Sequence, residues 1–233
     1  MGLRMLDLYC GGGGAAMGYS RAGIPDITGV DINKQPRYPF QFIQGDALEY
    51  LSAHWQEYDI IHASPPCQAY TRKQTDWGRK RTHWTDHPDL LGPTRDMLLA
   101  TGLPFVIENV VGAPIRPDIM LCGTMFGLRI SKHRLFESNY RLYPPDRLCG
   151  HSDIYNPWKG EGRSADAMRE AMGIDWLPTS GGASRKRGDT GDLYNAIPPA
   201  YTEFIGRILL ESIGHGEKAH TLIQTSIWGD DPP

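Results

Sequence analysis

The 233-residue chain has no long hydrophobic run, few cysteines and no excess of positive charge. No apolar stretch approaches the roughly 18–20 residues that a membrane-spanning helix needs, so no membrane partner is expected. The formal net charge of −3 excludes a polybasic protein that binds nucleic acid over its whole surface, and any such surface must be local. The length suits one domain with a continuous core and a concave site.

Only four cysteines occur: Cys10, Cys67, Cys122 and Cys149. Their irregular spacing argues against a disulfide framework, and residues 1–10 have the pattern of a strand rather than of a secretory leader. A reducing cytoplasm is therefore the expected compartment. The segment Cys149-Gly150-His151 offers two kinds of metal ligand. Because no second ligand pair is evident beside it, no metal site is expected.

The chain does contain a regular series of short apolar runs, each ending in polar or glycine-rich residues. The first leads into Gly11–Gly14, which a helical pattern follows. The five runs are residues 3–9, 27–30, 40–43, 58–62 and 104–107. In a parallel sheet such strand ends gather at one edge, where open α/β folds bind ligands. The series predicts an α/β, Rossmann-like fold, with a mostly parallel sheet and helices on both faces.

The remainder of the chain is less regular. Further strands are expected at residues 121–128 and 134–137, and helices at residues 15–22, 94–100, 164–173 and 198–213. Residues 1–138 are expected to form the core, and residues 139–192 a short irregular region. The polar tail, residues 214–233, is expected to be poorly ordered.

Three features of the first runs suit an adenosyl cofactor. The glycine cluster after the first run lets backbone approach a nucleotide-like group. Asp31, about 20 positions later, can accept hydrogen bonds from ribose hydroxyls, and Asp46 can hold an adenine amino group. These features leave a dinucleotide and S-adenosylmethionine both open.

Cys67 and Glu108 indicate which class of reaction the chain could catalyse. Cys67 follows two prolines at the end of the fourth run, where nearby amides and cations are expected to lower its thiol pKa. Glu108 follows the fifth run, where burial could raise its pKa enough to hold a proton. A nucleophilic thiol with a proton-donating carboxyl is what attack at C6 of a cytosine requires.

These segments resemble the motifs of one known family. Asp7-Leu8-Tyr9-Cys10-Gly11-Gly12-Gly13-Gly14, Pro65-Pro66-Cys67-Gln68 and Glu108-Asn109-Val110 are similar to the first, fourth and sixth motifs of the cytosine-C5 DNA methyltransferases. Lys132–Phe136 and Asn195–Pro199 resemble the eighth and tenth. The short form is similar to the compact enzymes of bacteriophages. The resemblance implies that the protein is an S-adenosylmethionine-dependent monomer in the cytoplasm of a bacterial or phage-infected host.

The resemblance also implies roles for individual residues. Cys67 would be the nucleophile and Glu108 the acid at N3, while Arg134 would hold the target cytosine. Residues 193–213 would return to the core and complete the cofactor pocket. The residues expected to bind S-adenosylmethionine are Asp7, Tyr9, Cys10, Gly11, Gly12, Gly13, Asp31, Ile32, Asp46, Ala47, Pro65, Asn195 and Ala196.

The implied substrate is double-stranded DNA, from which the cytosine must be flipped out. Cations interleaved with aromatic residues after Cys67 are expected to contact phosphates, while Gln68 fills the vacated stack. The residues expected to bind nucleic acid are Gln68, Arg72, Lys73, Arg79, Lys80, Arg81 and Lys132. A second basic cluster, Arg185–Arg187, is equally compatible with a solvated loop.

The chain departs from the family in two ways. The ninth motif is not recognisable, and residues 139–192 form a much shorter candidate target-recognition region than the family has. A cognate restriction nuclease or phage proteins are possible partners. Methylation of RNA and a catalytically idle DNA-binding relative remain as alternatives. An amino-group methyltransferase would have an aromatic residue after Pro-Pro, and a dehydrogenase would have a spaced Gly-x-Gly-x-x-Gly; neither occurs here.

Overall fold

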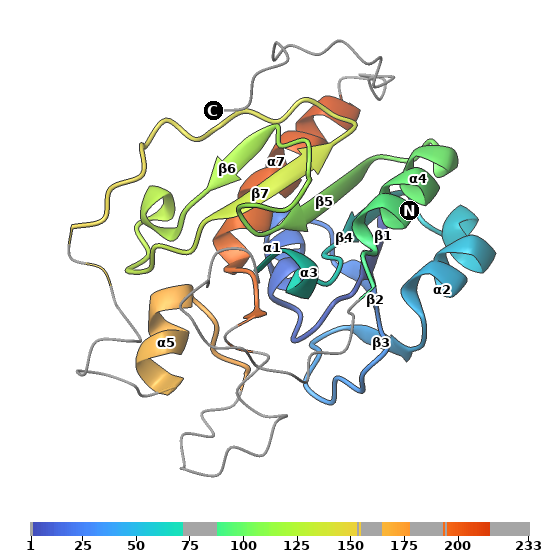
Figure 1. Ribbon diagram of the computed structural model, residues 1–233, viewed down its shortest axis with the longest axis horizontal. Coiled ribbons are helices and arrows are strands. Elements are labelled where there is room, and N and C mark those ends of the chain that lie inside the picture. Colours follow the sequence, from blue (N-terminus) through green and yellow to red (C-terminus); the bar gives the residue numbers. More distant parts are fainter. Residues whose placement is uncertain are drawn as a thin grey trace.

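The computed structural model describes residues 2–71, 88–152, 154, 165–177, 193 and 195–214. These residues contain a seven-stranded sheet in the order β3-β2-β1-β4-β5-β7-β6 (Figure 1). The strands are β1 (Arg4–Leu8), β2 (Asp26–Asp31), β3 (Gln41–Gln44), β4 (Ile60–Ala63), β5 (Phe105–Asn109), β6 (Ile119–Leu121) and β7 (Arg134–Ser138). The first five are parallel, and β7 runs antiparallel to both β5 and β6. The mostly parallel α/β sheet expected from the sequence is confirmed.

Helices cover both faces of this sheet. They are α1 (Gly14–Ala22), α2 (Ala47–His54), η1 (Trp55–Glu57), α3 (Gln68–Thr71), α4 (Leu91–Thr101), η3 (Gly123–Phe126), α5 (Ala165–Met172) and α7 (Pro199–Gly214). Because side chains alternate along a strand, Met5 packs in the layer with α1 and α7, whereas Leu6 packs in the layer with α2 and α4. Helix α5 lies with a third, smaller cluster, at the other end of the molecule from α2 and α4 (Figure 1).

Two glycines bring α1 and α7 into close contact. A Cβ atom on Gly18 would lie 2.0 Å from Thr202 Oγ1, and one on Gly206 would lie 2.7 Å from the Cβ of Ala22. The Thr202 hydroxyl donates to the carbonyl oxygen of Ala15 at 2.8 Å. The C-terminal helix is thereby fixed against the helix that follows the glycine loop, so both ends of the chain contribute to the same site.

Most expected elements are present; the differences include residues 122–128 and helix α2. The strand expected over residues 121–128 is wrong beyond Leu121, where the 3₁₀ helix η3 follows. The backbone turns there because Gly127 has a φ of 75° and a Cβ on Gly123 would lie 2.4 Å from the Ile130 oxygen. Helix α2 was not expected; Asp46 caps it by accepting from the amides of Leu48 and Glu49.

Parts of the expected organisation lie outside the described residues. Of residues 139–192, the structure describes 139–152, 154 and 165–177, and of residues 214–233 it describes only Gly214. The N-cap expected at Ser164 is also outside them, although α5 itself begins at Ala165. Among the described helices, none is long and apolar enough to cross a membrane.

Candidate active site

A cavity of about 300 Å³ opens where β1, β2, β4 and β5 end. Because these strands are parallel, their carboxyl ends lie at one edge of the sheet, as the sequence predicted. Fourteen of the residues predicted to form the site line this cavity: Asp7, Tyr9, Cys10, Gly11, Gly12, Asp31, Ile32, Pro65, Cys67, Gln68, Glu108, Arg134, Asn195 and Ala196.

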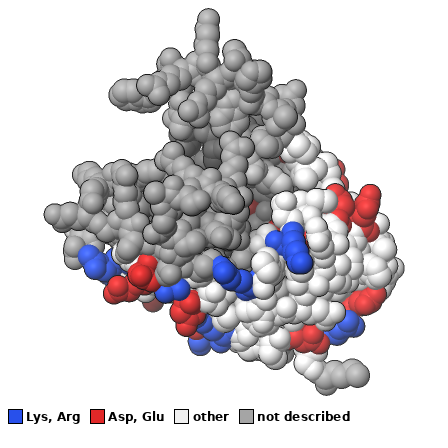
Figure 2. Space-filling model, turned by 90° about the horizontal axis from the view of Figure 1, so that it is seen from below, with Lys and Arg blue, Asp and Glu red and all other residues white. Residues whose placement is uncertain are grey.

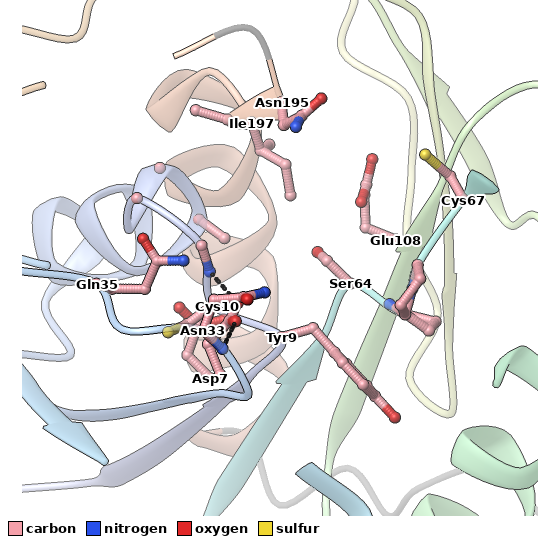
Figure 3. Close-up of a pocket in the computed structure, with 18 of the residues that line it drawn as sticks. Asp7, Tyr9, Cys10, Asn33, Gln35, Ser64, Cys67, Glu108, Asn195 and Ile197 are labelled. Carbon is pink, nitrogen blue, oxygen red and sulfur yellow. Dashed lines mark hydrogen bonds between the residues drawn. The ribbon is translucent and has the colours of Figure 1, made fainter. Parts of the chain in front are cut away.

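The glycine loop forms one wall of the cavity. Tyr9 and Gly11 have φ angles of 57° and 47°, so the chain turns sharply as it leaves β1. The Asp31 carboxylate accepts from the Gly11 amide at 3.1 Å and from the Asn33 amide at 2.8 Å (Figure 3). Asp31 therefore fixes the loop, while its position in the wall leaves it available to ribose hydroxyls. The Tyr9 hydroxyl is hydrogen-bonded to Thr94 Oγ1 at 2.9 Å.

Asp7 is a buried carboxyl with one unsatisfied oxygen. Its Oδ2 accepts from the Tyr38 hydroxyl at 2.9 Å, whereas no described residue hydrogen-bonds to Oδ1. Burial raises the pKa of Asp7 to about 7, partly offset by the Tyr38 hydrogen bond. A buried acceptor at the cavity wall suits a cationic or hydrogen-donating ligand group, because such a group would satisfy Oδ1 and favour the ionised carboxylate.

Cys67 lies in the loop that follows β4, with its thiol directed toward the same space as the Glu108 carboxyl (Figure 3). Asn109, the last residue of β5, donates from Nδ2 to the carbonyl oxygen of Pro65 at 3.1 Å. Burial raises the pKa of the Cys67 thiol, and the nearby Arg134 opposes this rise only in part. The expected lowering of that pKa is therefore wrong for the free protein, since desolvation outweighs the cations.

Glu108 and Arg134 form a buried ion pair, with Arg134 Nε 2.8 Å from Glu108 Oε1. The two residues lie on adjacent antiparallel strands, because Glu108 pairs with Phe136 and Asn109 with Leu135. Burial raises the pKa of Glu108, while Arg134 and a hydrogen bond to Ser64 lower it. The effect of burial is the largest of these, so the pKa of Glu108 is raised overall, and Glu108 holds a proton more readily than an exposed carboxyl does.

A buried hydrogen-bonded chain supports Glu108 from beneath. The Tyr19 hydroxyl and His62 Nδ1 are 3.0 Å apart, and His62 Nε2 lies 3.0 Å from Ser64 Oγ. Burial lowers the pKa of His62 to about 3, so its ring is neutral. The ring therefore transmits hydrogen bonding and no charge to Ser64, which in turn contacts Glu108.

Lys132 does not occupy the exposed position that a phosphate contact needs. It is only 9% exposed, and its ammonium donates to the carbonyl oxygen of Ala196 at 2.7 Å. Burial, reinforced by Arg134, lowers the pKa of Lys132 to about 7. Its observed contact ties the strand that carries Arg134 to the C-terminal segment that carries Asn195 and Ala196.

Three residues predicted to bind the cofactor do not line the cavity. Gly13 precedes α1 with a φ of 81°, and a Cβ there would lie 2.6 Å from Pro39 Cδ. Asp46 caps α2, and Ala47 is buried. Their observed roles are in the local fold.

The expected nucleic-acid contacts Arg72, Lys73, Arg79, Lys80 and Arg81, and the second cluster Arg185–Arg187, lie outside the described residues. Gln68, which follows Cys67, is exposed and lines the cavity. On the face drawn in Figure 2, the described basic and acidic side chains are interspersed. The described part of that face therefore carries no patch of purely positive or purely negative charge.

The sequence did not identify several residues of the site. Ser64, Asn33, Gln35 and Ile197 line the cavity, and Asn109 supports it from behind Pro65. Ser64 is adjacent to the motif that contains Cys67, while Asn109 and Ile197 lie within recognised motifs, so these positions were the available signal. Gln35 and Asn33 follow β2 closely, but nothing in their composition distinguished them from an ordinary loop.

No protein-family model and no curated protein sequence matches this chain. Among solved structures, the Schizosaccharomyces pombe (S. pombe) Dnmt2 methyltransferase matches with a TM-score of 0.61 and 14% identity, over 91% of this chain and 99% of that one. The Entamoeba histolytica methyltransferase EhMeth matches with a TM-score of 0.59 and 14% identity, over 91% and 99%. A putative DNA modification methyltransferase from an E. coli prophage shares 18% identity over 57% of this chain and 45% of its own, with a TM-score of 0.39. This chain thus spans less than half of the prophage protein.

These similarities establish the fold. The chain has the Rossmann-like fold of the methyltransferases, and its structural similarity to the cytosine-C5 group extends over most of its length. The resemblance noted in the motifs is confirmed at that level.

Proposed function

We propose that the protein transfers a methyl group from S-adenosylmethionine to C5 of a flipped-out cytosine in double-stranded DNA. The observation that carries this proposal is the convergence of Cys67, Glu108 and Arg134 in the cavity that the glycine loop also lines. A thiol, a protonatable carboxyl and a cation within one cavity are the groups that this reaction needs.

The cavity suits the adenosyl cofactor at two points. The unsatisfied Oδ1 of Asp7 can accept from the cationic amino-acid part of the cofactor, and the Asp31 carboxylate, which lines the cavity at the end of β2, can accept from ribose hydroxyls. When bound, S-adenosylmethionine supplies an electrophilic methyl group. The remaining chemistry belongs to the residues of the chain.

In the proposed mechanism the Cys67 thiolate adds to C6 of cytosine and forms a carbon–sulfur bond. Glu108 donates its proton to N3, or shares it in a hydrogen bond, so the electron pair displaced from the C5–C6 double bond makes C5 nucleophilic. Arg134 holds Glu108 in position at 2.8 Å and favours the carboxylate that proton donation leaves behind. After C5 is methylated, solvent water takes the C5 proton, the electron pair of that bond re-forms the C5–C6 double bond as the Cys67 thiolate leaves, and N3 returns its proton to Glu108.

The full chain should be incubated with methyl-labelled S-adenosylmethionine and, in parallel, with unmodified duplex DNA and with RNA. Digestion to nucleosides and chromatography would then identify the modified base. Labelled 5-methylcytosine from DNA supports the proposal, and the same product from RNA alone replaces the DNA substrate with RNA. Absence of 5-methylcytosine from both polymers overturns it.

A second assay tests the covalent step itself. Duplex DNA that contains 5-fluorocytosine should form a stable adduct, because fluorine at C5 prevents the elimination. Cys67→Ser should form no adduct while it still binds S-adenosylhomocysteine, which serves as the control for folding. A Cys67→Ser protein with full methyl transfer would exclude the covalent mechanism.

A further inference from the structure

Four sulfur and imidazole side chains gather beside the β6–β7 pair, apart from the residues that line the cavity. They belong to Cys122, His133, Cys149 and His151, and one ligand atom from each lies within 4.8 Å of every other. Cys122 directly follows β6, and His133 directly precedes β7. Because Leu121 pairs with Arg134 in the antiparallel register, the hairpin brings the first cysteine and the first histidine together.

The segment after β7 supplies the other two side chains. Cys149 Sγ lies 2.8 Å from His151 Nε2 and 3.3 Å from His133 Nε2, and Cys122 Sγ lies 3.5 Å from His151 Nε2. Around a tetrahedral zinc ion, with Zn–S about 2.3 Å and Zn–N about 2.0–2.1 Å, ligand atoms are roughly 3.3–3.8 Å apart. Two of the three separations fall within that range, and the third, between Cys149 and His151 at 2.8 Å, is shorter, so these two side chains would move apart to admit an ion.

We propose that Cys122, His133, Cys149 and His151 bind one Zn²⁺ ion in a tetrahedral Cys₂His₂ site. Two thiolates and two imidazoles are the ligand set that zinc prefers, and the two thiolate charges would neutralise the ion in a partly buried place. Cys122 is fully buried and Cys149 and His133 are partly so, whereas His151 lies at the exposed side.

Thr124 provides the outer contacts that a zinc–thiolate site uses. Its hydroxyl oxygen lies 3.3 Å from Cys122 Sγ, donates to Cys149 Sγ at 3.9 Å and accepts from the Gly150 amide at 3.3 Å. Such hydrogen bonds orient cysteine ligands and tune the charge on sulfur. One hydroxyl therefore connects both cysteines and the turn between Cys149 and His151.

The site is structural rather than catalytic, because four protein ligands fill the tetrahedral coordination of zinc and leave no position for a substrate. Its role follows from its place in the chain. His133 is adjacent to Arg134, whose Nη1 donates to the His133 carbonyl oxygen at 2.8 Å. The ion would fix the start of β7, and with it Arg134, to Cys149 and His151 in the first part of the candidate target-recognition region.

The spacing of these residues does not predict this site. Along the sequence Cys149 and His151 form an isolated pair, since Cys122 and His133 are far from them and do not form a zinc-finger spacing with them. The second pair becomes visible only when the β6–β7 hairpin is formed. The inference does not depend on the substrate proposed above.

The full chain, purified under reducing conditions without a metal-affinity step, should contain about one zinc ion per molecule by inductively coupled plasma mass spectrometry. After removal of zinc with a chelator, titration with Co²⁺ should produce visible d–d bands and a sulfur-to-cobalt charge-transfer band, both typical of tetrahedral thiolate coordination. Added Zn²⁺ should abolish these bands. This titration uses the unmodified chain, so it does not depend on the folding of any variant.

Two ligand variants and a matched control complete the test. Cys149→Ser and His151→Gln should each lose most of the bound zinc, whereas His54→Gln, at a histidine outside the cluster, should retain it. A metal-free wild-type chain without cobalt bands would overturn the proposal. Full zinc content in both ligand variants would do the same.

Discussion

The side-chain amide of Asn109 donates to the main-chain oxygen of Pro65 at 3.1 Å and joins the two strand ends that carry the proposed chemistry. The other end of that amide, Oδ1, accepts from the Val110 amide at 2.9 Å, which fixes its orientation. Asn109 is 1% exposed, so the bond is shielded from water. It therefore sets the position of the Cys67 loop relative to Glu108.

We expect Asn109→Ala to reduce methyl transfer by about 10- to 100-fold, because misplacing a reactive group by about 1 Å can cost a hundredfold in rate. Binding of S-adenosylhomocysteine should change little. The measurement is kcat for methyl transfer together with ligand affinity. Asn139→Ala is the matched control: Asn139 makes buried hydrogen bonds to Phe105 and Leu103 at the opposite end of β5. Equal loss of kcat in both variants would contradict a positioning role.

Glu108→Gln should abolish proton donation while it keeps the size of the side chain. Loss of a general acid typically costs 10²–10⁴-fold in rate, and we expect kcat to fall within that range. Glu137→Gln tests whether any buried ion pair has the same effect, since Glu137, on the neighbouring strand β7, pairs with Arg95 of helix α4 at 2.6 Å. That variant should lower thermal stability and spare kcat per folded molecule. If Glu108→Gln kept most of its activity, the assigned role would be wrong.

The Cys67 thiol should react slowly with iodoacetamide at neutral pH, because burial raises its pKa above the ordinary value. The thiol is the uncharged form, so its reactivity should increase as the pH rises toward that pKa. Arg134 lowers the pKa of Cys67, and Arg134→Gln should therefore move the reactivity midpoint to higher pH. Mass spectrometry of the Cys67 peptide separates this signal from the other cysteines. A midpoint below that of an ordinary cysteine would contradict the burial argument.

Affinity for S-adenosylhomocysteine should depend on the ionisation of Asp7. With a pKa of about 7 in the free protein, Asp7 is mostly protonated at pH 6 and mostly ionised at pH 8. If the ligand's ammonium group requires the carboxylate, affinity should increase roughly tenfold across this interval. Isothermal titration at the two pH values measures the change. Asp7→Asn should bind weakly at both, and an equal pH dependence in that variant would exclude Asp7 as its source.

The same pKa has a consequence for stability. Because the folded pKa of about 7 lies above the ordinary carboxyl value of 3.8, the native protein binds one more proton than the unfolded chain between these pH values. The contribution of Asp7 to stability should therefore decrease as the pH rises from about 4 to 7. We expect Asp7→Asn to be more stable than the wild type at pH 8, with a smaller difference at pH 5. Urea unfolding at both pH values provides the comparison.

Gly18→Ala should destabilise the α1–α7 contact. The added methyl group would lie 2.0 Å from Thr202 Oγ1 and 2.2 Å from the Pro199 carbonyl oxygen, and overpacking of this kind costs about 1–3 kcal/mol. A fall of several degrees in Tm is expected for a chain of this size. Gly92→Ala is the control within α4, where no atom lies within 4 Å of the added carbon. It should be neutral or raise Tm, since alanine favours helix by up to about 1 kcal/mol. A Gly18→Ala protein as stable as Gly92→Ala would contradict the contact.

The sequence was sufficient for the repeating part of the fold and for the residues at the strand ends. Five apolar runs predicted five parallel strands, because burial on both faces demands such runs and parallel strands place their carboxyl ends together. The motifs around Cys67 and Glu108 located one cavity for the same reason. The sequence failed at residues 122–128, where close backbone packing at Gly123 overrides an apolar pattern.

The tertiary structure decided what depends on contacts between distant residues. The sequence by itself placed Cys67 and Glu108 at one sheet edge, since each adjoins the carboxyl end of a parallel strand. Arg134 begins its strand, and only the antiparallel direction of β7 brings it to that edge. Only the folded chain determined that burial raises the thiol pKa of Cys67, and that Lys132 is buried against Ala196. Only the β6–β7 hairpin brings Cys122 and His133 to Cys149 and His151. Desolvation and ligand geometry depend on contacts between residues that are distant in the sequence and meet only in the folded chain.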